Sequence, residues 1–133
     1  MELKNAIYYA KEIIKMHPQY LLCGSTALII GGKIPSRDVH DLDFCCGISH
    51  IHEVKPLRFL RDDGYHIHHY DGYDTYKIDV DGPYNYYYNV FVHKDPKYLY
   101  AQIVNGIQCQ SLDQILFWKK SFGRSKDKKD MGV

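Results

Sequence analysis

The chain has 133 residues, of which 45% are hydrophobic, 25% are charged and 14% are aromatic. This length suits one compact domain, and these proportions exclude a disordered chain, a collagen-like repeat and a coiled coil. Seventeen Lys and Arg against sixteen Asp and Glu give a net charge of +1, so overall charge does not indicate a nucleic-acid-binding protein. No apolar run approaches the roughly 20 residues of a membrane span, and the N-terminus lacks the pattern of a signal peptide, so we expect no membrane association and a cytoplasmic location.

The first third of the sequence predicts alternating helices and short strands. Apolar residues recur at helical spacing from Leu3 to Ile14, and the pattern stops at His17-Pro18. Ser25 is suited to cap a second helix, which Gly31-Gly32 ends. The segments expected between these points and residue 61 are a strand over 20–23, a helix over 26–30, a strand over 41–46 and a helix over 54–61.

The remainder begins with a region rich in β-forming residues. Gly-containing turns divide it, which predicts an antiparallel meander of three strands over 65–70, 73–80 and 84–92. A short helix over 98–104, a strand over 107–109 and a helix over 112–122, capped by Ser111, are expected to follow. The whole order predicts a single mixed α/β (α+β) domain over residues 1–133.

Two acidic residues separated by one apolar residue are the most informative short motif. Asp41 and Asp43 flank Leu42, and residues two apart on a strand point to the same face. Two neighbouring carboxylates repel each other unless a cation lies between them, and hard oxygen ligands suit Mg²⁺. The alternative is an exposed acidic pair on an edge strand, which the apolar neighbours Leu42 and Phe44 disfavour.

Gly24-Ser25 forms a second motif, because a glycine follows a short strand and a serine opens a helix. Such a turn presents free backbone amides, which suit a phosphate anion. An ordinary helix cap is the alternative explanation.

Taken together, these motifs resemble the signature of the nucleotidyltransferase superfamily, which has the DNA polymerase β-like fold. The resemblance rests on residues 22–28 (Leu-Cys-Gly-Ser-Thr-Ala-Leu), Arg37, residues 41–44 (Asp-Leu-Asp-Phe), and a C-terminal helix with Lys119 followed by an Arg-x-Lys-Asp segment at 124–127. It is closest to the small AbiEii-type and minimal nucleotidyltransferases, and it covers roughly residues 20–130.

The resemblance implies roles for individual residues. Gly24, Ser25 and Thr26 would bind the nucleotide phosphates, and Asp41 and Asp43 would bind Mg²⁺ (or Mn²⁺) and position the α-phosphate. Lys119 would neutralise triphosphate charge, and Asp127 would orient that lysine or an acceptor group. Arg37 would either contact a phosphate or brace the loop before the acidic pair.

One position departs from the superfamily pattern. A third carboxylate usually comes from the last strand of the meander, and here the expected alignment places Asn89 in that position. Asparagine offers a neutral oxygen to a metal ion but cannot act as a general base. Asp79 and Asp81 lie one strand earlier, and Asp79 would take this role only if the expected register is wrong.

Other features allow two interpretations each. His66 and His68 would share a strand face, either as a metal pair or as ordinary polar residues. The tyrosines at 84–88 suit either base stacking or sheet packing, and the basic run at 119–129 suits either RNA binding or a solvated helix. The four cysteines lack the spacing of a zinc site, so we expect reduced and largely buried thiols.

The resemblance therefore implies transfer of a nucleoside monophosphate from an NTP to an acceptor hydroxyl. The acceptor would be an RNA or tRNA end, a protein or a small molecule, and the biological setting would be a toxin–antitoxin or phage-defence system. A domain of this size leaves little room for an acceptor-binding lobe, so a homodimer or a partner protein would complete the site. The alternative is a nucleotide- or RNA-binding module in which Asn89 marks weakened or lost catalysis.

Overall fold

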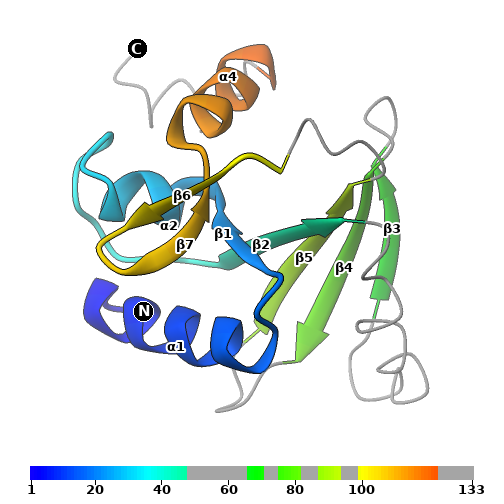
Figure 1. Ribbon diagram of the computed structural model, residues 1–133, viewed down its shortest axis with the longest axis horizontal. Helices are drawn as coiled ribbons and strands as arrows, with labels where there is room; N and C mark the ends of the chain where they lie inside the picture. The colour runs from blue at the N-terminus through cyan, green and yellow to red at the C-terminus, as the bar shows by residue number, and fades with distance from the viewer. Residues whose placement is uncertain (48–65, 71–74, 82–86, 94–98, 123–133) are drawn as a thin grey trace.

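A computed structural model describes residues 1–47, 66–70, 75–81, 87–93 and 99–122 of the chain (Figure 1). The helix expected over 54–61 and the C-terminal residue Asp127 lie outside these residues. The described elements are α1 (Leu3–Met16), β1 (Leu21–Cys23), α2 (Gly24–Ile30), β2 (Leu42–Gly47), β3 (His66–Tyr70), β4 (Thr75–Asp81), β5 (Tyr87–His93), β6 (Ala101–Val104), β7 (Ile107–Gln110) and α4 (Leu112–Phe122). In β3 and β4 the description is of the backbone.

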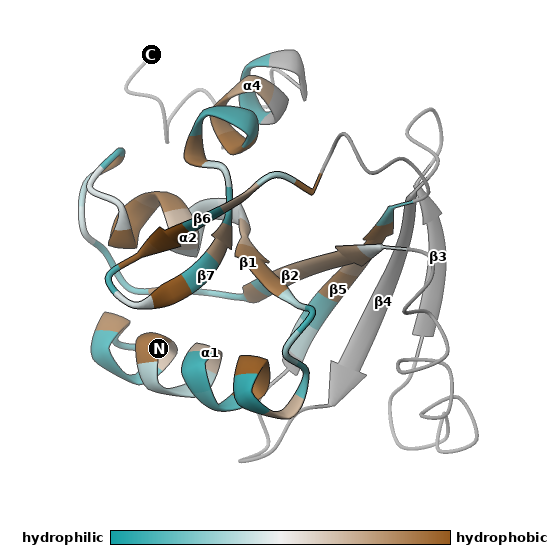
Figure 2. Ribbon diagram, in the orientation of Figure 1, coloured by the Kyte–Doolittle hydropathy of each residue, from teal (hydrophilic) through white to brown (hydrophobic). Residues whose placement is uncertain are grey.

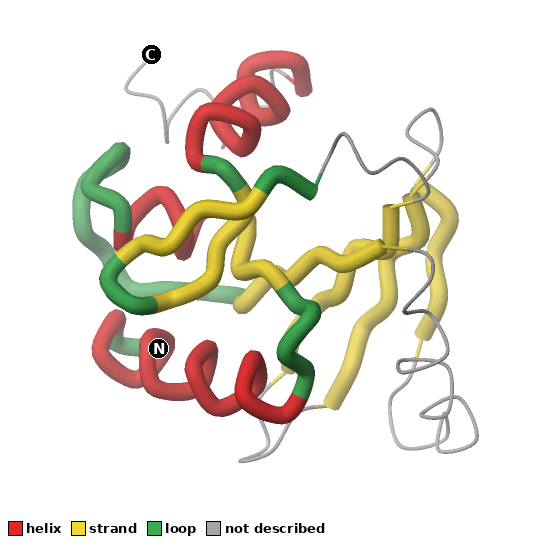
Figure 3. Tube along the Cα trace, viewed as in Figure 1, coloured by secondary structure: helices red, strands yellow, loops and turns green. Residues whose placement is uncertain are grey.

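The described strands join in one mixed sheet of order β3-β4-β5-β2-β1-β7-β6 (Figure 3). The β2–β5 and β1–β7 pairs are parallel, and the other neighbours are antiparallel. The antiparallel β3-β4-β5 run confirms the predicted meander, and the helices pack around the other half of the sheet, so the expected mixed α/β class is confirmed.

Helix α1 is amphipathic and follows the predicted periodicity. Its buried residues Ala6, Ala10 and Ile13 recur at intervals of three and four, which places them on one face. The helix continues to Met16, and the amide of His17 still donates to the carbonyl of Ile13, just before Pro18. Hydrophobic and hydrophilic residues alternate along the ribbon of α1 (Figure 2).

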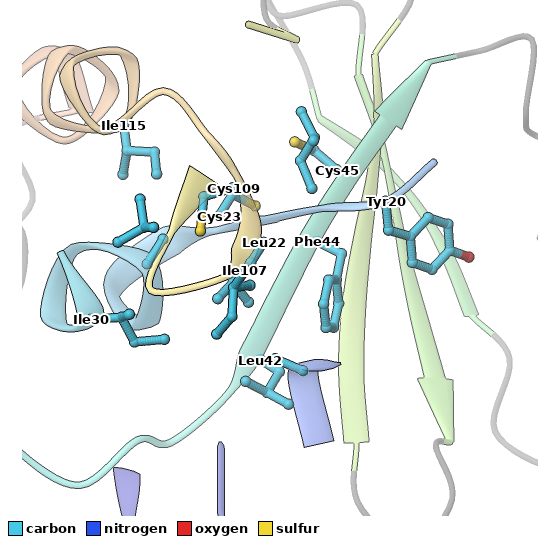
Figure 4. Close-up of a cluster of buried hydrophobic side chains, with 14 of the residues drawn as sticks. Tyr20, Leu22, Cys23, Ile30, Leu42, Phe44, Cys45, Ile107, Cys109 and Ile115 are labelled. Atoms are coloured by element: carbon cyan, nitrogen blue, oxygen red, sulfur yellow. The ribbon is translucent and has the colours of Figure 1, made fainter. Parts of the chain in front are cut away.

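The centre of the core is a row of aromatic rings on one face of the sheet. Phe44 on β2 is fully buried, and its ring centroid lies 5.9 Å from that of Tyr20 and 5.5 Å from that of Tyr88. Leu22 and Leu42 lie on the same face (Figure 4). Tyr88 therefore contributes to packing on this face of the sheet. The other tyrosines of the 84–88 cluster are not described at the level of side chains.

Two local predictions are wrong. The segment expected as a helix over 98–104 instead contains β6, because Asn105 and Gly106 form a two-residue turn that pairs Val104 with Ile107. Both turn residues have positive φ, 50° and 77°, which is the conformation that an Asn-Gly hairpin turn requires. The second helix begins at Gly24 with Cys23 at its N-cap and no side-chain cap, so Ser25 lies inside the first turn and does not cap it.

The described residues include no helix that is long and apolar enough to cross a membrane.

Candidate active site

Asp43 lies on a central strand, and its partners in register come from both adjacent strands. Cys23, the last residue of β1, is its partner on one side, and Asn89 on β5 is its partner on the other. Directly paired residues project to the same face of a sheet. The three residues therefore share the face opposite the aromatic row, because Asp43 alternates with Phe44 along β2.

Asn89 holds one oxygen of the Asp43 carboxylate. The Asn89 Nδ2 group donates to Asp43 Oδ1 at 2.9 Å, and both side chains are half-buried. An ionised carboxylate only accepts hydrogen bonds, so the amide must present its NH₂ group to Asp43. This bond fixes the orientation of the carboxylate. It also brings together Asp43 and Asn89, which the sequence analysis assigned to the same metal site.

Gly24 leaves the space that the second oxygen of Asp43 occupies. A Cβ atom at Gly24 would lie 2.5 Å from Asp43 Oδ2 and 3.2 Å from Asp43 Cβ. The backbone of Gly24 also has φ +69°, a left-handed conformation that residues with a Cβ rarely adopt. Glycine is therefore required at this position for two reasons: the backbone is left-handed, and the Asp43 carboxylate leaves no room for a Cβ atom.

Asp41 lies immediately before β2 and is exposed, so the strand begins one residue later than the sequence suggests. Its backbone carbonyl accepts a hydrogen bond from the Thr26 hydroxyl at 3.2 Å, and Thr26 is 2% exposed. The buried hydroxyl thus ties α2 to the segment that carries Asp41. The structure gives Thr26 a positioning contact, whereas the resemblance implied contact with a nucleotide.

The remaining predicted site residues lie on different elements. Arg37 is exposed in the segment before β2, where its guanidinium donates to the carbonyl of Asp38 at 3.5 Å, a contact that braces this segment locally. Lys119 lies near the end of α4 and is only 7% exposed, which is unusual for a lysine. Helix α4 packs against α2 and β7, and so belongs to the same half of the domain as Gly24.

Cys23, Cys45 and Cys109 form a cluster of buried thiols (Figure 4), and Cys23 is the register partner of Asp43. A hydrogen bond with Cys45, together with burial and the nearby charge of Asp43, raises the pKa of Cys23. Burial and the proximity of Cys45 raise the pKa of Cys109 to about 12. All four cysteines are buried, as predicted, and the structure pairs none of them in a disulfide. Thiols in this state are poor nucleophiles and poor metal ligands.

The donor set around Asp43 consists of oxygen ligands. Among the side chains that the structure describes, no three His, Cys, Asp or Glu residues gather as a metal-binding group. Asp43 supplies a carboxylate and Asn89 supplies an amide, and the exposed Asp41 lies two residues before Asp43 in the chain. One or two carboxylates, completed by substrate phosphates, are what Mg²⁺ typically takes from a protein. The residues present therefore fit a magnesium ion that binds together with a phosphate-bearing substrate.

Comparison with known proteins gives a match in structure but not in sequence. No protein-family model and no curated protein matches the chain. Among solved structures, the lincosamide antibiotic adenylyltransferase LnuA, with lincomycin bound, aligns with a TM-score of 0.60 and 15% identity, over 96% of this chain and 93% of that chain. An antigenic nucleotidyltransferase-like protein from Paracoccidioides brasiliensis aligns with a TM-score of 0.46 and 17% identity, over 98% of this chain and 73% of that one. JHP933 from Helicobacter pylori aligns with a TM-score of 0.44 and 17% identity, over 86% and 56%.

The chain therefore has a nucleotidyltransferase-like fold, as the short motifs indicated. The particular structure that supports this assignment is that of LnuA, because its alignment spans nearly the whole of both chains. At 15% identity, this likeness establishes the fold but not the activity, which depends on the residues of the site.

Proposed function

We propose that this protein is a magnesium-dependent nucleotidyltransferase that transfers a nucleoside monophosphate from an NTP to an acceptor hydroxyl. In this reaction the acceptor oxygen forms a bond to the α-phosphorus. The bond from that phosphorus to the bridging oxygen breaks, and pyrophosphate leaves with the electron pair. The hydroxyl proton passes to solvent.

The observation that carries the proposal is the way in which Asp43 is held. One carboxylate oxygen accepts from Asn89, and the other lies over a glycine that has no room for a side chain. A carboxylate that is already fixed in one orientation is suited to a charged ligand, because little reorganisation is needed when the ligand binds.

The remaining residues would position and neutralise the triphosphate. A magnesium ion bound by Asp41 and Asp43 would supply positive charge to the α-phosphate during transfer. The Thr26 hydroxyl holds the segment that carries Asp41, and the Gly24-Ser25 turn would offer backbone amides to the phosphates. Lys119 would stabilise the departing pyrophosphate. Asp127 would orient Lys119 or the acceptor, and Arg37 would brace its segment or contact a phosphate.

For the acceptor we propose a hydroxyl group on a small molecule, on a protein or on an RNA or tRNA end. The LnuA structure contains the small molecule lincomycin, and its fold extends over almost the same length of chain, which favours a small hydroxylated acceptor. A toxin–antitoxin or phage-defence setting, ATP as the donor, and a homodimer or partner that completes the acceptor site belong to the same proposal.

A second candidate function is a nucleotide-binding module without catalysis. The amide of Asn89 favours it, because this group occupies the register position beside Asp43 where a carboxylate is usual in the superfamily. Such a module would bind an NTP in a metal-dependent manner and turn none over.

The test is incubation of the purified protein with each α-labelled NTP and Mg²⁺ or Mn²⁺. The acceptors offered are total RNA and lincomycin, and label on the protein itself is also measured. Asp43→Ala is the inactivated variant. Asp38→Ala is the matched control, since it removes an exposed carboxylate from the segment just before Asp41. Circular dichroism checks that both variants fold.

We expect label to enter one acceptor with the wild type and Asp38→Ala, and at least 100-fold less with Asp43→Ala. Equal transfer by Asp43→Ala would refute the assignment of the acidic pair. Metal-dependent NTP binding without transfer to any acceptor would favour the binding module. The absence of both binding and transfer would refute both candidates.

A further inference from the structure

One edge of the sheet is open and partly apolar. Strand β6 is the last in the strand order, and among the described strands it pairs only with β7. Ala101, Gln102 and Ile103 on this strand are exposed, and Ile103 is 67% exposed. Tyr100, directly before the strand, is also 67% exposed. An exposed edge of this kind is a template on which another strand can pair.

The register of the β6–β7 hairpin determines which backbone groups point toward this edge. The Ser111 amide donates to the Tyr100 carbonyl at 2.7 Å, so these two residues form a hydrogen-bonded pair. Such pairs alternate with non-hydrogen-bonded pairs along an antiparallel ladder. Ala101 and Ile103 lie one and three positions further along, in pairs of the second kind. Their N–H and C=O groups therefore point away from β7, toward the open edge.

The hairpin also lacks charge. Residues 99–112 contain no Asp, Glu, Lys or Arg, in a chain in which 25% of the residues are charged. Natural proteins often protect an exposed edge with a charged residue, and this edge has none. Charges on an edge attract an oppositely charged partner and repel an identical copy, because two-fold symmetry brings the same residues together. The uncharged edge therefore fits a second copy of this chain better than a partner selected by charge.

We propose that two copies of this protein pair through their β6 strands, antiparallel and about a two-fold axis at Gln102. In this arrangement Ala101 of each copy faces Ile103 of the other. These are the two residues with outward backbone groups, so each pair exchanges both of its N–H···O bonds. The large side chain of Ile103 lies opposite the small one of Ala101 on the exposed face, which leaves room for both.

This inference goes beyond the proposed function, which included a homodimer without assigning its surface. Only the use of the dimer to complete an acceptor site rests on that function. The pairing is closed, because each copy uses its β6 edge once. It joins only one short strand from each copy, and interfaces of small area are typically weak and transient, so we expect dimers at protein concentrations of about 100 µM.

The first measurement is sedimentation equilibrium of the purified full chain from about 5 to 500 µM. We expect the mass to rise from 15.6 kDa toward twice this value and then to level off. A protein that remains monomeric at the highest concentration would overturn the proposal, and the edge would then be left for a different chain. A mass that rises beyond the dimer would also overturn it, because the two-fold pairing is closed.

Ala101→Pro tests the backbone pairing, with Ala101→Ser as the matched control. Proline removes one outward N–H from each copy and leaves the hydrogen bonds to β7 intact, whereas serine keeps the donor. We expect Ala101→Pro to weaken dimerisation by about tenfold or more, and Ala101→Ser to stay within about threefold of the wild type. Equal dimerisation by the two variants, both folded by circular dichroism, would show that the dimer uses another surface.

A mixture of two charged variants tests the register. Ile103→Lys and Ala101→Glu each bring like charges together when the variant pairs with itself, so each alone should dimerise about tenfold more weakly than the wild type. In the mixture, the new positive charge of one chain faces the new negative charge of the other. We expect the mixture to dimerise at least about fivefold more tightly than either variant alone. If it does not, although both variants are folded, the two positions do not face each other and the proposal fails.

Asp43→Ala separates this inference from the proposed function. Asp43 is on β2, and β1 and β7 lie between β2 and β6, so this variant should dimerise within about twofold of the wild type. If the wild type dimerises through β6 but transfers no label and binds no NTP, the proposed function fails and the pairing stands. If the protein transfers label but remains monomeric, the pairing fails and the proposed function stands.

Discussion

Gly24→Ala tests whether the carboxylate of Asp43 is held as tightly as the structure indicates. The substitution forces a residue with a Cβ into a left-handed backbone conformation, which costs about 1–2 kcal/mol. It also places that Cβ 2.5 Å from Asp43 Oδ2, where atoms must move apart. Overpacking of this kind adds about 1–3 kcal/mol. We therefore expect a total loss of about 2–5 kcal/mol in the free energy of unfolding.

Two other glycines separate these contributions. Gly32 and Gly106 have φ of +72° and +77°, and a Cβ at either would meet nothing within 4 Å. Gly32→Ala and Gly106→Ala should therefore show the backbone cost alone. The excess loss in Gly24→Ala, about 1–3 kcal/mol, is the part due to Asp43. For a domain of this size, that excess corresponds to a Tm lower by roughly 4–12 °C than in the two controls.

The assay is urea denaturation of the three variants and the wild type, with thermal melting as a second measure. The same Gly24→Ala change is then made in the Asp43→Ala background, which removes the carboxylate. If the steric account is correct, the excess loss falls to near zero in this background, because the two sites are coupled through one contact. If Gly24→Ala costs no more than Gly32→Ala, then Asp43 moves aside freely and is not fixed by its surroundings.

Two further predictions follow from the pKa values. Burial raises the pKa of Cys109 to about 12, and the Cys45 hydrogen bond raises that of Cys23, so both thiols should react with Ellman's reagent at pH 8 only after unfolding; rapid reaction in the folded protein would contradict this. Burial lowers the pKa of His93 to about 4, so between pH 6.5 and 4 the unfolded chain binds a proton that the folded chain does not. Stability should therefore fall by up to about 3 kcal/mol as the pH drops through this window, and His93→Gln should remove that part of the slope in urea denaturation. Equal slopes for the wild type and His93→Gln would show that His93 is not the group responsible.

Local sequence signals predicted most of the helices and strands. The apolar spacing of α1, the β-rich segments of the meander and the helix after Ser111 all appear close to their expected bounds. The hairpin of β6 and β7 was missed, although Asn105-Gly106 is the sequence signal that could have revealed it. Residues 101–104 form a strand only because β7 pairs with them, and this pairing outweighs a weak helical preference.

The sequence by itself determined the identities and local spacing of the chemical groups. Gly24 follows a short strand, Asp41 and Asp43 lie two apart, and Lys119 is on a helix; these are properties of neighbouring residues, which backbone geometry translates directly into local structure. The nucleotidyltransferase-like fold could also be inferred from these motifs, because they occur in the expected order.

Only the tertiary structure decided how these groups meet. The bond between Asn89 and Asp43 joins residues 46 positions apart, and it depends on the parallel pairing of β2 with β5. The steric need for Gly24 appears only when β1 and β2 are side by side, and the adjacency of Asp79 to Asn89 depends on the register of β4 with β5. A shift of one residue in any of these pairings would turn the side chains to the opposite face, and that register is fixed by burial of the apolar face that Phe44 occupies rather than by any local signal.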